Sequence, residues 1–260
     1  MVEHTREHPR LQERALEGRR YPLPLGTLFV PKRWKSGVRR PLVVHFHGAP
    51  WIVETAAERL RTAVIAVQIG AGSSRYAAPF RDDPALFPRM LAEAERSAAT
   101  RFDPVILSSW SAGYGAIREI LRQPANAPRV ARLLAIDSIH AGYASGKPGP
   151  LESEITPADM EEFAIFAREA LAGRRMLVLA HSEIFPGTFA STTETADFLL
   201  TRLGLRRKAI LRWGPMRTQQ LSDTRRGKLR VMGFAGNSAP DHVDLFHALP
   251  DLLRQLVPRR

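Results

Sequence analysis

The sequence predicts an α/β fold in which a mostly parallel central sheet carries helices on both faces. Short apolar runs alternate with helix-like segments along most of the 260 residues, and this alternation is typical of parallel sheets. Several runs are continuously apolar, as expected for strands that are buried on both sides. Polar residues follow directly after these runs, where open parallel sheets place their chemistry.

The expected strands are short apolar runs that stop at a glycine or a polar residue. The clearest example begins at Pro41 and stops at Gly48. Because strands of a buried sheet are typically a few residues long, runs of this length favour strand over helix. The expected strands cover 25–31, 41–48, 63–68, 104–109, 130–136, 176–180, 209–213 and 229–234.

The segments between these strands have helical patterns, apart from a glycine-serine loop expected at 70–75. Pro157 suits the first turn of a helix. The hydroxyl-rich stretch 186–195 is read as a cap, with Thr192 or Thr193 at the N-cap, in preference to a lining for substrate. The expected helices cover 54–60, 84–99, 112–122, 156–172, 192–203 and 241–257.

Length and composition favour one globular domain. The chain is 44% hydrophobic and 25% charged, which suits a single domain over 21–260 after a polar tail at 1–20, either helical or loose. The Gly- and Pro-rich stretch within 142–150 makes 141–172 the candidate for a small lid or cap.

Composition also limits the classes of function. Cysteine is absent, so disulfides and thiolate metal sites are excluded. No apolar run approaches the roughly 20 residues of a membrane span, so no transmembrane segment is expected. The first twenty residues lack the apolar core of a signal peptide, which makes the cytoplasm the default compartment and leaves export open.

The net charge of +12 comes mainly from scattered pairs of arginines. A nucleic-acid partner is not expected, because such proteins usually concentrate their cations on one helix or arm. A solvated basic surface is the first interpretation, and attraction to an anionic substrate, polymer or membrane surface is the second. The oligomeric state stays open.

The stretch from Val105 to Ile117 contains a candidate nucleophile elbow. An apolar run leads into Ser109-Trp110-Ser111-Ala112-Gly113 and then into a helical pattern. In such an elbow a serine stands on a strained strand-to-helix turn, and the residues two before and two after must be small. Ser109 replaces the commoner glycine but is still small. The simpler alternative is that Ser111 only begins a helix.

Candidate chemistry also follows the other strands. His47-Gly48 ends an early run, Asp137 and His140 follow another, and His181 and Glu183 follow the next. His242 comes after the last run, through a short loop. A serine, a carboxylate and a histidine therefore occur in the order Ser, acid, His.

On these motifs the chain resembles α/β-hydrolases of the esterase and lipase kind, over about 25–257. The resemblance implies a catalytic triad with Ser111 as nucleophile and His242 as base. His247, five residues later, is expected inside the final helix as an ordinary packed or surface residue. Asp241 and Asp244 are expected to cap or decorate the same helix.

The acid of the triad has two candidates. The family most often places it in the loop that here contains Glu183, whereas some members place it one strand earlier, at Asp137. Asp137 is preferred because it stands directly on a strand end, and Glu183 is the alternative. The acid would orient the imidazole and stabilise its protonated form.

The oxyanion hole is expected to use the backbone N–H groups of Ala112 and Ala49. Pro50 has no N–H to donate. His45 and His47 point to the same side of their strand, so a metal site with His140 or His181 is the alternative to histidines that bond to backbone. No metal and no cofactor are expected. Trp110 and Tyr114 either shape the acyl pocket or pack under the sheet.

The predicted function is a metal-independent serine esterase that cleaves a small carboxylic ester through an acyl-enzyme. Peptide or amide cleavage on the same triad is one alternative. The other is a hydrolase fold without turnover, which uses its basic surface to bind an anionic partner. The acyl and leaving groups depend on pocket shape, which a fold alone does not define.

Overall fold

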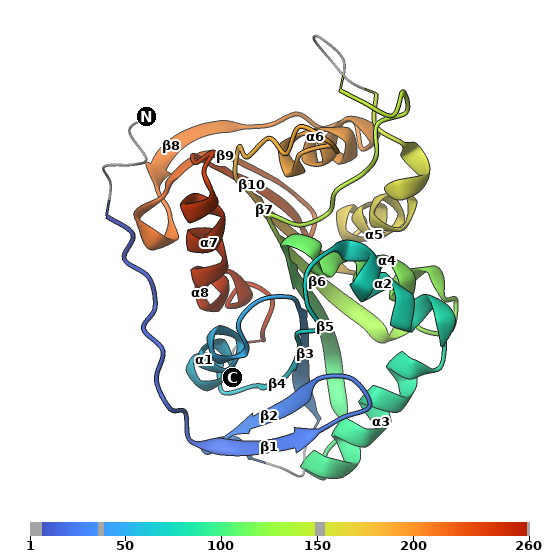
Figure 1. Cartoon of the computed structure of the whole chain (residues 1–260), viewed down its shortest axis with the longest axis vertical. Coiled ribbons are helices and arrows are strands. Elements are labelled where there is room, and N and C mark those ends of the chain that lie inside the picture. Colours follow the sequence, from blue (N-terminus) through green and yellow to red (C-terminus); the bar gives the residue numbers. More distant parts are fainter. Residues whose placement is uncertain (1–6, 36–38, 149–153, 259–260) are drawn as a thin grey trace. The chain divides into compact units, whose positions relative to one another are not determined.

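A computed structural model describes residues 7–35, 39–148 and 154–258 (Figure 1). The chain forms two compact units, each described here by itself. Unit 1 comprises Met1–Arg10 and Ala135–Ala248, and unit 2 comprises Leu11–Leu134 and Leu249–Arg260. Parts of the expected tail (1–6) and of the expected lid (149–153) lie outside the described residues.

The strands of unit 2 have a parallel centre and an antiparallel edge. Strand β3 pairs in parallel with β4 and with β5, and β2 and β1 continue the sheet antiparallel in the order β1-β2-β4-β3-β5. Val43, Val64 and Ile106 in the parallel strands are fully buried, which explains their continuously apolar sequences. The bounds are β1 Gly18–Pro22, β2 Thr27–Pro31, β3 Arg40–Phe46, β4 Ala63–Val67, β5 Phe102–Trp110 and β6 Val130–Ile136, in which the chain passes into unit 1.

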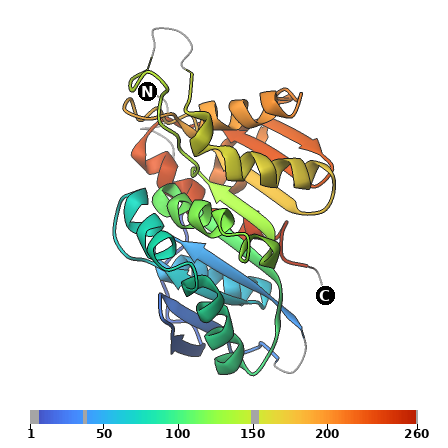
Figure 2. The same cartoon turned by 90° about the vertical axis from the view of Figure 1, so that its right-hand side faces the viewer.

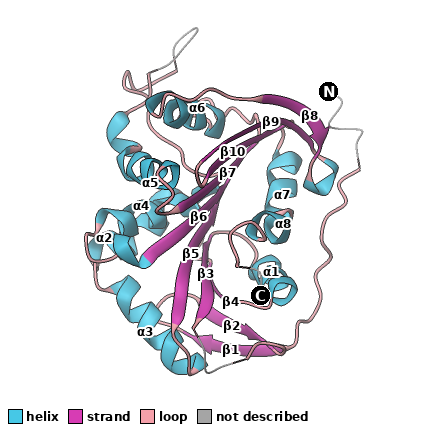
Figure 3. Ribbon diagram, turned by 180° about the vertical axis from the view of Figure 1, so that it is seen from behind, coloured by secondary structure: helices cyan, strands magenta, loops and turns pink. Residues whose placement is uncertain are grey.

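Helices cover both faces of the unit 2 strands. Helices α1 and α8 pack together on one face, and α2, α3 and α4 lie on the other (Figures 1 and 3). Close packing of α2 on α4 requires Gly115, because a Cβ there would lie 2.1 Å from the Ser73 carbonyl oxygen. The bounds are α1 Pro50–Leu60, α2 Ser73–Asp82, α3 Leu86–Ala98, α4 Tyr114–Arg122 and α8 Leu249–Leu253, with short 3-10 turns η2 Ser111–Gly113 and η3 Ala127–Arg129.

Unit 1 repeats this layering with fewer strands. Strand β7 pairs in parallel with β10, and β9 and β8 continue antiparallel to the edge. Helices α5 and α6 lie on one face (Figure 2) and α7 lies on the other (Figures 1 and 3). The bounds are β7 Met176–His181, β8 Ala209–Trp213, β9 Gln219–Arg226, β10 Leu229–Phe234, α5 Glu161–Leu171, α6 Thr192–Arg202, α7 Ala239–His247, η4 Pro157–Asp159 and η5 Pro215–Arg217.

The predicted α/β class is confirmed, since parallel strands with helices on both faces occur in each unit. All eight expected strands are present within a few residues of their predicted bounds. Three elements were not predicted: α2, which overlaps the expected loop at 70–75, and the strands β1 and β9. β1 also replaces the end of the expected tail, and 7–17 contains no helix.

Three helix predictions need correction. The helix expected at 241–257 is two helices, α7 and α8, which meet at Ala248 just before Pro250. The helix expected from 156 begins with the 3-10 turn η4, and α5 starts only at Glu161. The N-cap of α6 is Ser191, because Ser191 and Glu194 form a reciprocal capping box. The longest described helix, α3, has 13 residues, and none of the described helices combines the length and apolarity of a bilayer span.

Candidate active site

Ser111 stands on the sharp turn between β5 and α4. Its backbone has φ +48°, a left-handed conformation that L-residues rarely adopt. Strand β5 ends at Trp110, the turn η2 covers Ser111–Gly113, and α4 begins at Tyr114. A nucleophile elbow requires this strand–turn–helix geometry, with backbone strain at the serine on the tip of the turn, and the role of Ser111 as nucleophile stays a prediction.

Contacts with β3 leave little room on either side of Ser111. A Cβ on Gly113 would lie 2.1 Å from the Phe46 carbonyl oxygen, so no larger residue fits without moving the strand. On the other side of the turn, Ser109 is fully buried and stands opposite Phe46 in the β3–β5 register. Serine in place of glycine at this position is therefore accommodated.

The loop after β3 adjoins the elbow. The His47 ring stacks on Trp110 with centroids 5.1 Å apart and planes 11° apart, and Gly48 donates its N–H to Gln68 Oε1 at 2.8 Å. Ala49 follows and is the N-cap of α1. Ala49 and Ala112 thus belong to the same unit as Ser111, on backbone next to the elbow, and their role as oxyanion donors stays a prediction.

The strand-end histidines bond to backbone and hydroxyl groups. His45 Nδ1 lies 3.0 Å from Ser108 Oγ and Nε2 lies 2.8 Å from the His47 carbonyl oxygen. Burial lowers the pKa of His45 to about 3, so its ring is neutral at pH 7. His47 Nδ1 lies 2.9 Å from the Tyr76 hydroxyl, and His140 Nδ1 lies 2.9 Å from the Ala190 carbonyl oxygen.

Asp137 is a buried carboxylate at the end of β6 in unit 1. It is 2% exposed and has φ +40°, and its N–H donates to the Ala180 carbonyl oxygen at 2.8 Å. Ser182 donates to the carboxylate twice, from the backbone N–H at 2.5 Å and from Oγ at 2.8 Å. Thr192 Oγ1 lies 3.3 Å from the same group. These donors are neutral and fix both carboxylate oxygens.

His242 completes this arrangement. It lies in the first turns of α7, whose N-cap is Ser238, and its Nδ1 is 3.0 Å from Asp137 Oδ2. An ionised carboxylate has no proton to donate, so the hydrogen in this bond belongs to Nδ1. In the neutral ring Nε2 is then the unprotonated nitrogen, which is the tautomer that a general base needs.

The other candidate acid, Glu183, lies elsewhere. Its side chain is exposed, and its carboxylate has no hydrogen bond or ion pair with the described residues. Only its backbone is fixed, because the N–H donates to the Gly236 carbonyl oxygen at 2.9 Å. Of the two candidates, Asp137 is the one hydrogen-bonded to His242.

The sequence prediction missed Ser182 and misjudged Thr192. The hydroxyl-rich stretch does contain a cap, but Thr192 contacts Asp137 instead of serving as that cap. Thr193 Oγ1 contacts His181 Nδ1 at 3.1 Å and the Ser182 carbonyl oxygen at 2.9 Å. Burial lowers the pKa of His181, which keeps its ring neutral. The density of hydroxyls after a predicted strand end was the available signal for these donors.

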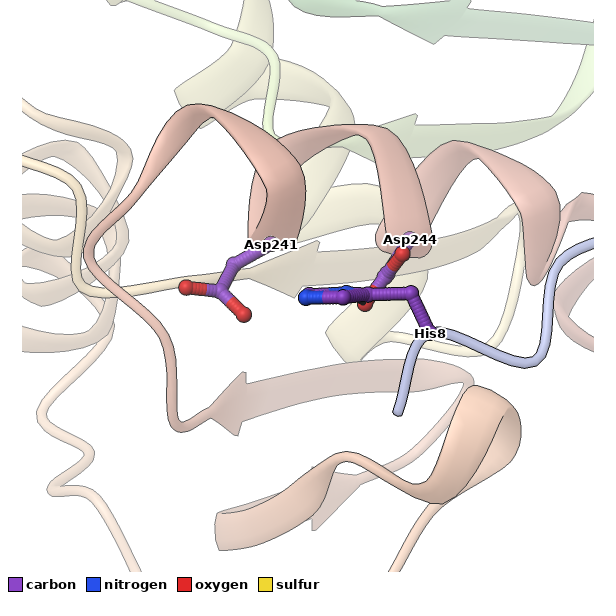
Figure 4. Close-up of side chains that lie close together, drawn as sticks. All are labelled: His8, Asp241 and Asp244. Atoms are coloured by element: carbon purple, nitrogen blue, oxygen red, sulfur yellow. Dashed lines mark hydrogen bonds and ion pairs between the residues drawn. The ribbon is translucent and has the colours of Figure 1, made fainter. Parts of the chain in front are cut away.

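Helix α7 is anchored by two buried carboxylates. Asp241 caps it, as predicted, by accepting from the Ser238 N–H at 3.1 Å and from Ser238 Oγ at 2.5 Å. Asp244 was expected at the surface or the cap, but it is fully buried. It contacts His8 Nδ1 at 2.5 Å and Arg10 Nε at 2.8 Å, and Figure 4 shows the His8 ring between the two carboxylates.

His8, Asp241 and Asp244 offer ligand atoms within 4.8 Å of one another, a spacing that a metal ion could use. However, the Arg10 guanidinium already contacts Asp244, and Ser238 already donates twice to Asp241. A cation would have to displace these donors. The contacts present favour an ion-pair cluster that holds residues 7–10 against α7.

Comparison with solved structures identifies the fold. EstE1, a thermostable carboxylesterase from a metagenomic library, is 14% identical, with 95% of this chain and 92% of that chain covered and a TM-score of 0.55. An esterase of Pyrobaculum calidifontis is 13% identical, with 95% and 87% covered and a TM-score of 0.51. Carboxyl esterase 2 of the fungus Tuber melanosporum is 13% identical, with 94% and 88% covered and a TM-score of 0.51.

The chain therefore has the α/β-hydrolase fold. No protein-family model matches it, and no curated protein matches its sequence. Similarity at this level of identity defines the fold and leaves function to be argued from the site.

Proposed function

We propose that this protein is a serine hydrolase that cleaves carboxylic esters through an acyl-enzyme. The observation that carries the proposal is the hydrogen bond between His242 Nδ1 and buried Asp137 Oδ2. It presents an imidazole in the tautomer of a general base, in the chain order of the hydrolase fold. The elbow conformation of Ser111 supports the nucleophile, and the esterases of the same fold support the substrate class.

In the proposed reaction Ser111 Oγ attacks the ester carbonyl while His242 Nε2 takes the hydroxyl proton. The N–H groups of Ala112 and Ala49 stabilise the negative charge on the carbonyl oxygen. His242 then returns the proton to the departing alcohol, and an acyl ester on Ser111 remains. Water, activated by His242, cleaves that ester and releases the acid. Asp137 stays ionised throughout and stabilises the protonated ring.

Replacement of the nucleophile tests the proposal directly. Ser111→Ala should abolish turnover of short nitrophenyl esters and covalent labelling by a fluorophosphonate probe. Ser97→Ala, on α3, is the matched control and should keep both. Wild-type protein that neither turns over the esters nor takes up the probe would contradict the proposal, as would labelling that persists in Ser111→Ala.

The leaving group can be tested with the same protein. Turnover of nitrophenyl esters without turnover of aminoacyl-nitroanilides supports an esterase. The opposite preference would assign the same residues to amide cleavage. The two substrate classes share the acyl-enzyme step, so Ser111→Ala should remove either activity.

A further inference from the structure

The edge strand β8 exposes two large apolar side chains. Leu211 is 74% exposed and Trp213 is 71% exposed, the highest values among the large hydrophobic residues that the structure describes. β8 is the last strand in its sheet order and pairs with β9 along one edge only. Exposed aromatic and aliphatic side chains that gather at one place mark an interaction surface more often than a free one.

The two side chains stand on either side of Arg212. Arg212 sends its guanidinium to Gln220 and Asp223, at 3.0 and 2.8 Å. The β8–β9 register shifts between Ala209 and Arg212, so Leu211 lies at an irregularity of the strand. Leu211 and Trp213 therefore form an exposed apolar pair two residues apart in the sequence.

Exposed cations lie at the start of β8, where Lys208 precedes Leu211 by three residues. Arg206 and Lys208 precede β8. Thr224 Oγ1, in β9, donates to the Arg206 carbonyl oxygen at 3.0 Å and accepts from the Lys208 N–H at 2.8 Å. Arg226, two residues after Thr224, projects to the same face as Thr224. All three side chains are exposed, and none has an ion pair with a described residue.

Two nearby aspartates are already neutralised, whereas Glu183, which lines the same pocket as Arg207 and Ala209, keeps an exposed carboxylate. Asp197 is paired with Arg207, at 2.5 Å. Asp223 contacts the guanidinium groups of Arg212, Arg225 and Arg230, each at 2.8 Å. The cations beside β8 therefore act on whatever approaches from outside rather than on these carboxylates.

We propose that the β8 surface, defined as Leu211 and Trp213 with Arg206, Lys208 and Arg226, docks on a lipid bilayer that contains anionic headgroups. An indole and an aliphatic side chain suit the boundary between headgroups and acyl chains. Cations next to them suit anionic headgroups, whose attraction supplements the burial of apolar area. Docking by this surface is independent of the reaction assigned to Ser111.

Vesicle sedimentation with the full-length chain tests the surface. Binding should be stronger to phosphatidylcholine vesicles that contain phosphatidylserine than to phosphatidylcholine alone, and it should weaken with salt. Arg206→Gln/Lys208→Gln should lower partition into the anionic vesicles roughly twenty-five-fold, at about fivefold per cation. Leu211→Ser/Trp213→Ser should lower it at least about tenfold through lost apolar burial. The tryptophan fluorescence of the wild type should shift to the blue on binding, and Leu211→Ser/Trp213→Ser should lose this shift.

Matched variants outside the surface provide the controls. Ile165→Ser removes an exposed apolar residue on α5, and Arg33→Gln/Lys35→Gln removes two exposed cations before β3. Both should bind as wild type does, and circular dichroism should show all variants folded. Equal binding to neutral and anionic vesicles, or equal losses in the controls, would overturn the proposal.

Two further results would assign the surface to another partner and overturn the lipid proposal. One is tighter binding to a single-stranded oligonucleotide than to anionic vesicles, lost in Arg206→Gln/Lys208→Gln but kept in Leu211→Ser/Trp213→Ser. The other is a dimer in the absence of vesicles that dissociates in Leu211→Ser/Trp213→Ser, measured by analytical ultracentrifugation.

Discussion

Among its described residues, unit 1 has two buried aspartates that each contact a histidine ring, and their surroundings differ. Asp137 lies 3.0 Å from His242 Nδ1, and its other partners are the neutral donors of Ser182 and Thr192. Asp244 lies 2.5 Å from His8 Nδ1, but its second oxygen contacts the Arg10 guanidinium. Both are aspartate–histidine pairs, but of the two carboxylates only Asp244 also contacts a guanidinium among the described residues.

The difference distinguishes the pair proposed for catalysis from a pair that joins two segments of the chain. Among the described residues no Lys or Arg side chain forms an ion pair with Asp137, so in the proposed reaction its charge faces the His242 ring. At Asp244 the Arg10 guanidinium contacts the same carboxylate as His8. The second pair instead joins residues 7–10 to α7, the helix that carries His242.

The largest expected effect concerns the first pair. Asp137→Asn should lower kcat for nitrophenyl esters by about 10⁴-fold, because the amide donates to Nδ1 and moves the ring proton to the nitrogen that must act as base. The measurement is steady-state kinetics on protein whose fold is verified by circular dichroism. Glu183→Gln is the comparison and should remain close to wild type. A large loss in Glu183→Gln with little loss in Asp137→Asn would exchange the roles of the two acids.

A smaller effect is expected at the second pair, and on stability instead of chemistry. Arg10→Ala removes a charge-assisted hydrogen bond from a buried carboxylate and should lower the free energy of unfolding by about 1.5–3 kcal/mol. Arg39→Ala breaks an exposed pair with Asp103 and should cost about 0–1 kcal/mol. Urea denaturation measures both. Equal losses of unfolding free energy in Arg10→Ala and Arg39→Ala would mean that the Arg10 guanidinium does not stabilise the buried Asp244 carboxylate.

The smallest effect appears only in acid and concerns Asp223. Burial raises the pKa of this carboxyl, but the hydrogen bonds and charges of Arg230 and Arg225 outweigh burial and hold it below its usual range. The unfolded residue titrates near pH 3.9. Its stabilising contribution is therefore complete above about pH 4 and declines as the pH falls further.

The corresponding measurement is the free energy of unfolding of wild type and Asp223→Asn at a series of pH values. The difference between the two proteins should be constant from neutral pH to about pH 4 and should shrink below it. A difference that stays unchanged in stronger acid would show that the arginines do not lower the pKa of Asp223.

Much of the fold was predictable because the buried strands have a simple signature. Strand β4 and the central residues of β3 and β7 form continuous apolar runs, and such runs indicate strands without a solvated face. Strands β1 and β9 were missed because they are polar and lie toward the edges. In β9 a charged residue, Asp223, is buried only because arginines from neighbouring strands surround it, and no local pattern contains that information.

The candidate site divides in the same way. Ser111 was proposed from the small residues around it, and the contact that a Cβ on Gly113 would make with Phe46 explains one of them. The sequence favoured Asp137 over Glu183 because Asp137 stands directly on a strand end, but both follow a strand and precede His242, so only the structure shows which one bonds to that ring. Ser182 and Thr192 as donors to Asp137 were missed because they lie 45 and 55 residues away from it in the chain.

The sequence by itself determined the α/β class, the turn that exposes Ser111 and the order of serine, acid and histidine, because these depend on residue size, hydrophobic pattern and chain direction. Tertiary structure decided which carboxylate bonds to His242, which aspartate binds Arg10, and that Leu211 and Trp213 of β8 are left uncovered. These outcomes depend on contacts between residues far apart in the chain, and burial makes such contacts decisive, because a carboxylate removed from water needs its donors within about 3 Å.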